Sequence, residues 1–152
     1  MTISSRLSMQ GALEPTARVL VVEDDALNRL IVCRLLSHGG YEATAANDGA
    51  QALELVATQA FHLVLMDWQM PDMDGLDLAH HIREHAPQAY IPIIVVSGDA
   101  QERLVNRSFG DDVTDYFDKG LGFSALSAFI QGYVRPEPET GGEVLYVEDS
   151  RV

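Results

Sequence analysis

The sequence predicts an α/β fold in which five parallel strands alternate with helices, (βα)5, to form a doubly wound sheet. The first observation is that short β-branched apolar runs alternate with longer amphipathic segments, the pattern of βαβ units. The second is size, because 152 residues with 47% hydrophobic content suffice for one domain with a core and are too few for two ordinary ones.

The predicted strands are short. Residues 19–22, 63–66 and 93–96 are β-branched and apolar enough to be strands covered on both faces. Residues 42–45 form a less apolar strand between the first two, and residues 115–117 form a short fifth strand.

Apolar residues at helical spacing predict the intervening helices. The predicted buried faces are Leu27, Leu30, Ile31 and Leu35 in the first helix, Leu53, Val56, Ala57 and Ala60 in the second, and Leu126, Phe129, Ile130 and Tyr133 in the last. The predicted caps are Asp25 for the first helix, Asp48 or Asn47 for the second, Asp74 for the third, and Asp99 with Glu102 as a capping-box partner for the fourth. Gly39 and Gly40 end the first helix.

Composition limits the class of protein and its partners. The net charge of −13 and the pI near 4.5 argue against direct nucleic-acid binding, which needs clustered Lys and Arg, and favour a protein or cation partner. Cys33 is the only cysteine, so no disulfide framework is expected and a reducing cytoplasm fits. No apolar run is long enough for a signal peptide or membrane span, so no membrane association is expected.

Composition also changes along the chain. Residues 1–16 are rich in Ser and polar residues and read as a flexible leader before a domain over residues 17–134. Residues 135–142 are a Pro/Glu/Gly linker. Residues 144–149, VLYVED, then repeat VLVVED of residues 19–24 with one substitution. We therefore interpret residues 143–152 as the first strand of a truncated second copy of the domain, with a chance match as the alternative.

Polar side chains stand where four of the five predicted strands end. Asp67 ends the third strand, Glu23 and Asp24 follow the first, Ser97 ends the fourth and Lys119 follows the fifth. In a doubly wound sheet with the first strand central, these ends converge on one edge, where open α/β folds bind ligands.

Three carboxylates close together predict a binding site for a hard cation. Mg²⁺ takes oxygen ligands and one or two carboxylates, so we expect Asp24 and Asp67 to bind it directly, Glu23 through water, and the main-chain carbonyl of Gln69 to add an oxygen. Asp67 can then act as a carboxylate nucleophile toward phosphorus. Lys119 and the hydroxyl of Ser97 would stabilise the phosphoryl oxygens.

These residues also carry a resemblance. Glu23-Asp24, Asp67 followed by Met70-Pro71-x-Met73-Asp74-Gly75, Ser97-Gly98 and Tyr116-x-x-Lys119 together resemble the receiver domain of two-component response regulators, over about residues 17 to 134. The resemblance implies a flavodoxin-like fold with strand order 2-1-3-4-5. It also implies phosphoryl transfer to Asp67 from a phosphohistidine on a sensor histidine kinase or a histidine phosphotransfer protein. Ser97 and Tyr116 would move as switch residues, and the surface of the fourth helix, fifth strand and fifth helix would carry the signal.

Two features depart from that family pattern. The residue after Lys119 is Gly120, where such receivers usually have a proline in a cis peptide. A cis bond to a non-proline residue costs roughly 2.5–4 kcal/mol. We therefore expect the loop that carries Lys119 to have a different shape. The stretch from Gly110 to Tyr116 is also longer than usual. We expect Asp67 to remain able to accept a phosphoryl group, and the signal that the switch residues pass on to be altered.

Other classes of protein share part of this pattern. A haloacid-dehalogenase-like phosphatase also uses an aspartate nucleophile and Mg²⁺, but it needs a second acid two residues on, where this chain has Gln69. A receiver that only docks and never accepts phosphate is the other alternative. His81 and His85 have zinc-ligand spacing without a further ligand, which favours a solvated polar face. Any output domain, for which a diguanylate cyclase is one candidate by resemblance, would follow a second receiver beyond Val152.

Overall fold

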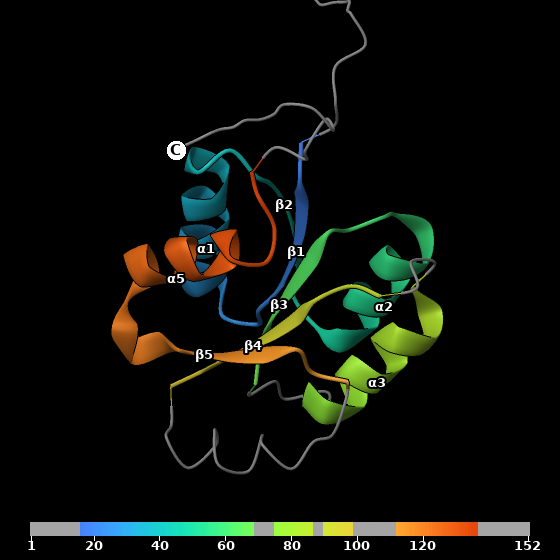
Figure 1. The fold of residues 1–152 in the computed structure, drawn as a ribbon. Coiled ribbons are helices and arrows are strands. Elements are labelled where there is room, and N and C mark those ends of the chain that lie inside the picture. The colour runs from blue at the N-terminus through green and yellow to red at the C-terminus, as the bar shows by residue number, and fades with distance from the viewer. Residues whose placement is uncertain (1–15, 69–74, 87–89, 99–111, 137–152) are drawn as a thin grey trace, which may run out of the picture.

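The computed structural model describes residues 16–68, 75–86, 90–98 and 112–136, and these form one five-stranded sheet flanked by helices (Figure 1). All neighbouring strands are parallel, and their order is β2-β1-β3-β4-β5. The predicted doubly wound sheet with the order 2-1-3-4-5 is therefore confirmed. The strands are β1 Arg18–Val22, β2 Glu42–Ala46, β3 Leu63–Asp67, β4 Ile93–Ser97 and β5 Asp115–Asp118.

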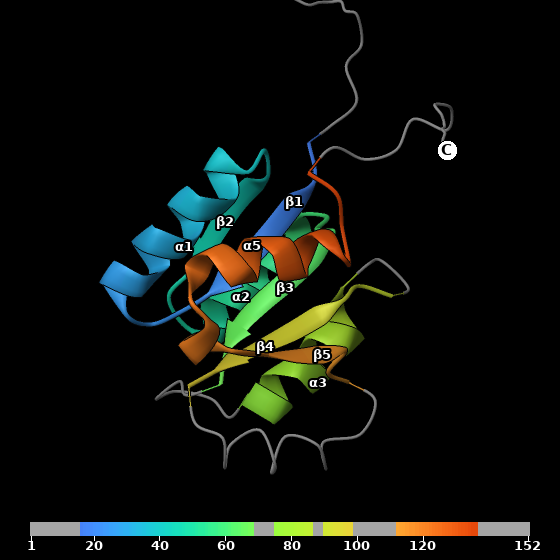
Figure 2. The same ribbon diagram turned by 60° about the vertical axis from the view of Figure 1, so that its left-hand side comes forward.

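Helices cover both faces of the sheet. The described helices are α1 Ala26–His38, α2 Gly49–Thr58, α3 Gly75–His85 and α5 Phe123–Gln131, with a short 3₁₀ turn, η1, at Lys119–Leu121. Figures 1 and 2 show α1 and α5 on one face and α2 and α3 on the other. β1, β3 and β4 are inner strands and β2 and β5 are edges, so the central strands are covered from both sides.

Two apolar clusters hold the helices against the sheet. Because side chains alternate along a strand, β1 sends Leu20 and Val22 to one face and Val19 and Val21 to the other. The cluster under α2 and α3 includes Val56, Val64, Met66, Leu78, Ile82, Ile93 and Val95. The cluster under α1 and α5 includes Val32, Leu36, Leu63, Leu65, Ile94, Phe117, Leu126 and Ile130.

The predicted buried face of the first helix was wrong for Leu27 and Leu30, whereas Leu35 packs against the core. Leu27 and Leu30 are 64% and 50% exposed, whereas the sheet-facing residues of α1 are Val32 and Leu36. Residues 30–33 and 35–36 of this helix are all apolar, so the sequence pattern leaves its rotation about its own axis undetermined. The predicted stripe, with Ile31 and Leu35, is offset by one residue from Val32 and Leu36, which is a rotation of about 100° around the helix axis.

The second helix needed a smaller correction. Its buried residues are Gly49, Ala52 and Val56, and Leu53 is packed against the core, but Ala57 and Ala60 are exposed. Alanine carries too little apolar surface to fix a helix face.

The predicted caps that the structure describes are confirmed. The side chain of Asp25 accepts a hydrogen bond from the amide of Asn28, and that of Asp48 accepts one from the amide of Gln51, both at 2.8 Å. At the end of α1, Gly40 has a φ of 95°, a left-handed conformation that favours glycine.

Several predictions lie outside the described residues. They are the caps Asp74, Asp99 and Glu102, the carbonyl of Gln69, the longer stretch after Gly110, the leader, most of the linker and the partial second copy. Within the described ranges, every helix is too short or too polar to cross a membrane.

Candidate functional site

Three carboxylates meet at the carboxyl edge of the sheet. β1 and β3 are parallel neighbours with Val22 level with Met66, so the residues that follow these two positions lie side by side. Glu23, Asp24 and Asp67 each offer an oxygen, and these oxygens all lie within 4.8 Å of one another. The predicted convergence of the three acids is thus present.

The crowding changes the ionisation of Glu23. Burial, the charge of Asp67 and a hydrogen bond with Asp67 together raise the pKa of Glu23 from 4.5 to about 7. The amide of Asp25, which donates to Glu23 Oε2 at 3.2 Å, and the charge of Lys119 oppose this rise. Burial and the neighbouring carboxylate of Asp67 thus favour the protonated form of Glu23.

The donor set of this cluster suits a hard divalent cation. All three groups are carboxylates, and Mg²⁺ prefers oxygen ligands and retains several waters. Asp24 is exposed and Asp67 is about nine-tenths buried, so one side of the cluster faces the protein and the other faces solvent. Asp24 and Asp67 would hold Mg²⁺ directly, with Glu23 behind them.

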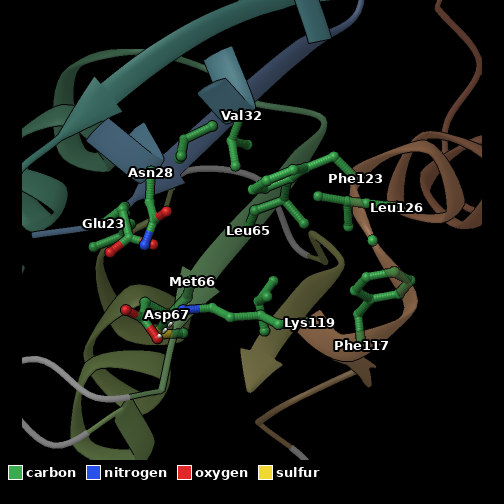
Figure 3. A pocket seen from close by; sticks show the side chains of 14 residues that line it. Glu23, Asn28, Val32, Leu65, Met66, Asp67, Phe117, Lys119, Phe123 and Leu126 are labelled. Carbon is green, nitrogen blue, oxygen red and sulfur yellow. Dashed lines mark hydrogen bonds and ion pairs between the residues drawn. The ribbon is translucent and has the colours of Figure 1, made fainter. Parts of the chain in front are cut away.

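Lys119 completes the site from the end of the edge strand β5. Figure 3 shows its side chain extended from the end of β5 toward β3, and its Nζ lies 3.5 Å from Asp67 Oδ1. The lysine side chain is 37% exposed and the aspartate 10%. The ammonium is therefore placed to contact a group bound on Asp67.

The loop that carries Lys119 has a different shape from the expected family loop. None of the described peptide bonds is cis, so the Lys119–Gly120 bond is trans. Residues Lys119–Leu121 form the 3₁₀ turn η1, and the side chain of Asp118 caps it by accepting a hydrogen bond from the amide of Gly120 at 2.8 Å. A side-chain cap thus fixes this turn without a proline.

A largely apolar cavity of about 70 Å³ lies beside the site between α1, the sheet and α5 (Figure 3). Val32, Leu65, Phe117, Phe123 and Leu126 line it, and its rim carries Glu23, Asp67 and Lys119. Apolar walls exclude water and strengthen electrostatic interactions at their edge.

Ser97 and Tyr116 take the positions that the sequence predicted on β4 and β5. Asp67 is level with Val96, so Ser97 lies one position further along the neighbouring strand, where it is 1% exposed. Tyr116 is partly buried and packs against the cluster under α2 and α3. Burial raises the pKa of Tyr116, and the nearby charge of Asp115 adds to this.

The sequence analysis missed two residues that position the site. Arg29 Nη1 donates to the main-chain carbonyls of Glu23 at 2.8 Å and Asp24 at 3.3 Å, so α1 holds the loop that carries the acids. Asp118 holds the lysine turn. The spacing of Arg29, one turn after the Asp25 cap, is a sequence signal that could have been used.

Cys33 and Trp68 each pack against one of the two apolar clusters. Cys33 packs against the cluster under α1 and α5, and burial raises the pKa of its thiol while the charge of Arg29 opposes the rise. Trp68 follows Asp67 directly and packs on the cluster under α2 and α3. As the only tryptophan of the chain, it is a natural fluorescence reporter for the site.

Comparisons with known proteins agree with this geometry. Residues 19–131 match the family model of the response regulator receiver domain. The chain is 29% identical over 122 residues to the two-component response regulator ORR3 of Oryza sativa, covering 80% of this chain and 93% of that protein. It is 36% identical over 117 residues to the sensor histidine kinase TmoS of Ectopseudomonas mendocina, covering 77% of this chain and 12% of that protein.

A solved structure has a similar fold. The response regulator TrrA of Thermotoga maritima, solved in complex with Mg²⁺ and BeF, superposes with a TM-score of 0.69 at 26% identity, covering 78% of this chain and 99% of that one. Receiver domains are regulatory phosphoacceptor modules, which matches an acidic edge with a facing lysine. From the family match over most of its length, the chain belongs to the response regulator receiver domain family.

Proposed function

We propose that this chain is a working phosphoacceptor that takes a phosphoryl group onto Asp67 in a Mg²⁺-dependent reaction. The observation that carries the proposal is the joint placement of three carboxylates within 4.8 Å and a lysine ammonium 3.5 Å from Asp67. A set of acids alone could be a solvated surface, but a lysine brought from a different strand supplies the second charge that phosphoryl transfer needs.

Each residue of the site has its own role in the phosphoryl transfer. A carboxylate oxygen of Asp67 attacks phosphorus, the bond from phosphorus to the donor imidazole nitrogen breaks, and the imidazole leaves with the electron pair of that bond. Lys119 donates to a phosphoryl oxygen from the β5 side, and the Ser97 hydroxyl donates from the β4 side. When bound at Glu23, Asp24 and Asp67, Mg²⁺ supplies positive charge that offsets the carboxylates and the phosphoryl oxygens.

The partner that donates the phosphoryl group is a histidine-bearing protein, either a sensor histidine kinase or a phosphotransfer protein. Exposed apolar side chains stand on the two segments that follow Glu23-Asp24 and Lys119. Of the six large ones among the described residues, Leu27 and Leu30 are on α1, and Leu121 and Phe123 lie within four residues of Lys119. Apolar side chains gathered on a surface favour a protein contact. A small donor molecule would not need them.

The wider roles follow from the family and the sequence. The chain acts as a regulatory module and not as an enzyme on other substrates, in the cytoplasm, with Ser97 and Tyr116 as the switch. The domain spans residues 17–134, and residues 143–152 begin a second receiver that leads to an output domain. These roles rest on the VLYVED repeat and on the family resemblance.

The test is phosphoryl incorporation by the chain. The wild type, Asp67→Asn and the control Asp77→Asn, an exposed acid in the first turn of α3, are incubated with acetyl phosphate and Mg²⁺ and weighed by intact mass spectrometry. We expect one phosphoryl group on the wild type and on Asp77→Asn, and none on Asp67→Asn. An unlabelled wild type would favour the receiver that only docks, and equal labelling of Asp67→Asn would place the acceptor elsewhere.

A further inference from the structure

The second half of α3 carries a histidine pair, His81 and His85, that the phosphoryl chemistry does not use. Three of the five histidines of the chain are on this helix. The rings of His81 and His85 lie nearly parallel, with centroids 6.3 Å apart and an interplanar angle of 15°. Residues four apart lie on the same side of a helix, so both imidazoles face one patch of solvent.

The hydrogen bonds of the pair fix which nitrogen is available. His81 Nδ1 lies 2.7 Å from the carbonyl oxygen of Asp77, and His85 Nδ1 lies 2.8 Å from the carbonyl oxygen of His81. A carbonyl oxygen only accepts, so each Nδ1 must carry the proton. In the neutral ring, each Nε2 therefore holds a lone pair, and neither Nε2 contacts another of the described residues in a hydrogen bond or ion pair.

We propose that the histidine pair binds a divalent transition-metal ion of the Zn²⁺, Ni²⁺ or Cu²⁺ class through the two Nε2 atoms. A histidine that ligates such an ion almost always donates its other N–H to a carbonyl or carboxylate, which fixes the tautomer and the ring orientation. Both histidines already do this. Imidazole suits these ions, whereas the carboxylates at Asp67 suit Mg²⁺, so the chain holds two sites that differ in the class of ion they select.

The site has two protein ligands, and water completes the coordination. Metal–nitrogen bonds are about 2.0–2.1 Å long, so the exposed rings must turn toward each other from their 6.3 Å separation. The χ2 torsion of histidine has a broad minimum, so a small tilt about χ2 can bring the Nε2 atoms together while each Nδ1 still faces its carbonyl oxygen. Binding would join the last two turns of α3.

His80 provides a matched control on the same helix. Its Nε2 lies 3.5 Å from Glu84 Oε2 and its Nδ1 lies 3.4 Å from Asp112 Oδ2. Both of its nitrogens therefore already have a carboxylate partner, unlike the Nε2 atoms of the pair. Replacing His80 removes a ring that lies edge-on to that of His81, with centroids 6.1 Å apart, but leaves both Nε2 atoms of the pair in place.

The experiment is calorimetric titration of the whole chain with Zn²⁺ in excess Mg²⁺, which occupies the acidic cluster. Because two linked ligands bind as a chelate, His81→Gln and His85→Gln should each weaken Zn²⁺ binding by about tenfold or more, whereas His80→Gln should bind as the wild type does. NMR should show the ring protons of His81 and His85 shifting together on titration, and circular dichroism checks that each variant is folded. The proposal is overturned if the wild type binds no Zn²⁺ under these conditions, if neither variant of the pair weakens binding, or if His80→Gln weakens it equally.

Discussion

The acidic side and the lysine side of the site are held in different ways. Asp67 is the last residue of an inner strand with neighbours on both sides, and Glu23 directly follows another inner strand. Lys119 follows the edge strand β5, sits in a 3₁₀ turn and is 37% exposed. The carboxylates are therefore fixed by the core of the sheet, whereas the ammonium depends on one capped turn.

The difference suggests a division of roles. The acids set whether the site can hold a metal ion and react, and we expect their removal to have large effects. The lysine turn sets how well a bound phosphoryl group is held, and we expect changes there to have graded effects.

The largest effect is expected on the acidic side. Asp24→Asn should weaken Mg²⁺ binding by about tenfold or more, because a direct carboxylate ligand is lost. Quenching or enhancement of Trp68 fluorescence during Mg²⁺ titration measures this. Asp25→Asn is the control, because it removes the same charge one residue away while asparagine caps a helix as well as aspartate. Equal weakening in both variants would show a general charge effect and contradict direct ligation.

A smaller effect should come from the ionisation of Glu23. The pKa of Glu23 is raised from 4.5 to about 7 in the metal-free protein, so Mg²⁺ binding must displace a proton below pH 7. Mg²⁺ affinity should therefore rise by up to about tenfold per pH unit until about pH 7 and then level off. Trp68 fluorescence titrations from pH 5.5 to 8.5, compared with Glu23→Gln, measure the slope.

The raised pKa of Glu23 also makes the stability of the metal-free protein depend on pH. Between pH 4.5 and about 7 the folded state binds more protons than the unfolded state, so the contribution of Glu23 is fully present below pH 4.5 and is lost as the pH rises through 7. Denaturation in EDTA should show this decline in the wild type and a flatter profile in Glu23→Gln. A rise in stability over this range that disappears in Glu23→Gln would contradict the assignment.

The smallest effect is expected on the lysine side. Asp118→Ala removes the cap of η1, which costs about 0.5–2 kcal/mol at a helix start, so the phosphorylation rate or the lifetime of the phosphorylated state should change by only a few-fold. Asp118→Asn keeps a side-chain oxygen that accepts from Gly120 and should behave nearly as the wild type. If Asp118→Asn is as impaired as Asp118→Ala, the charge of Asp118, and not its cap, is what matters.

The sequence predicted the acidic side better than the lysine side for a physical reason. A β-branched run ending in an acid predicts both a strand and the edge at which Asp67 stands, since parallel strands align their ends. The contact of Lys119 with Asp67 depends on the shape of a turn, and the sequence showed only that Gly120 makes this turn unusual. The cap by Asp118 is a single hydrogen bond to the main chain, which composition and periodicity do not register.

The buried face of α1 could not be predicted for a related reason. Val32 and Leu36 face the sheet while Leu27 and Leu30 face solvent, although all four are equally apolar. The rotation of this helix is decided by its packing against the sheet and against α5, and α5 is about ninety residues further along the chain. Leu27 and Leu30 stay apolar on the surface, where we place the phosphodonor protein.

The close approach of Trp68 to Gly75 has a consequence for which sequences this domain can accept. A Cβ built on Gly75 would lie 2.7 Å from Trp68 Cε3, closer than atoms can pack. The indole therefore fills the space that any side chain at the start of α3 would need. The side chains at positions 68 and 75 compete for the same space, so a larger residue at position 75 requires a smaller one at position 68, beside Asp67.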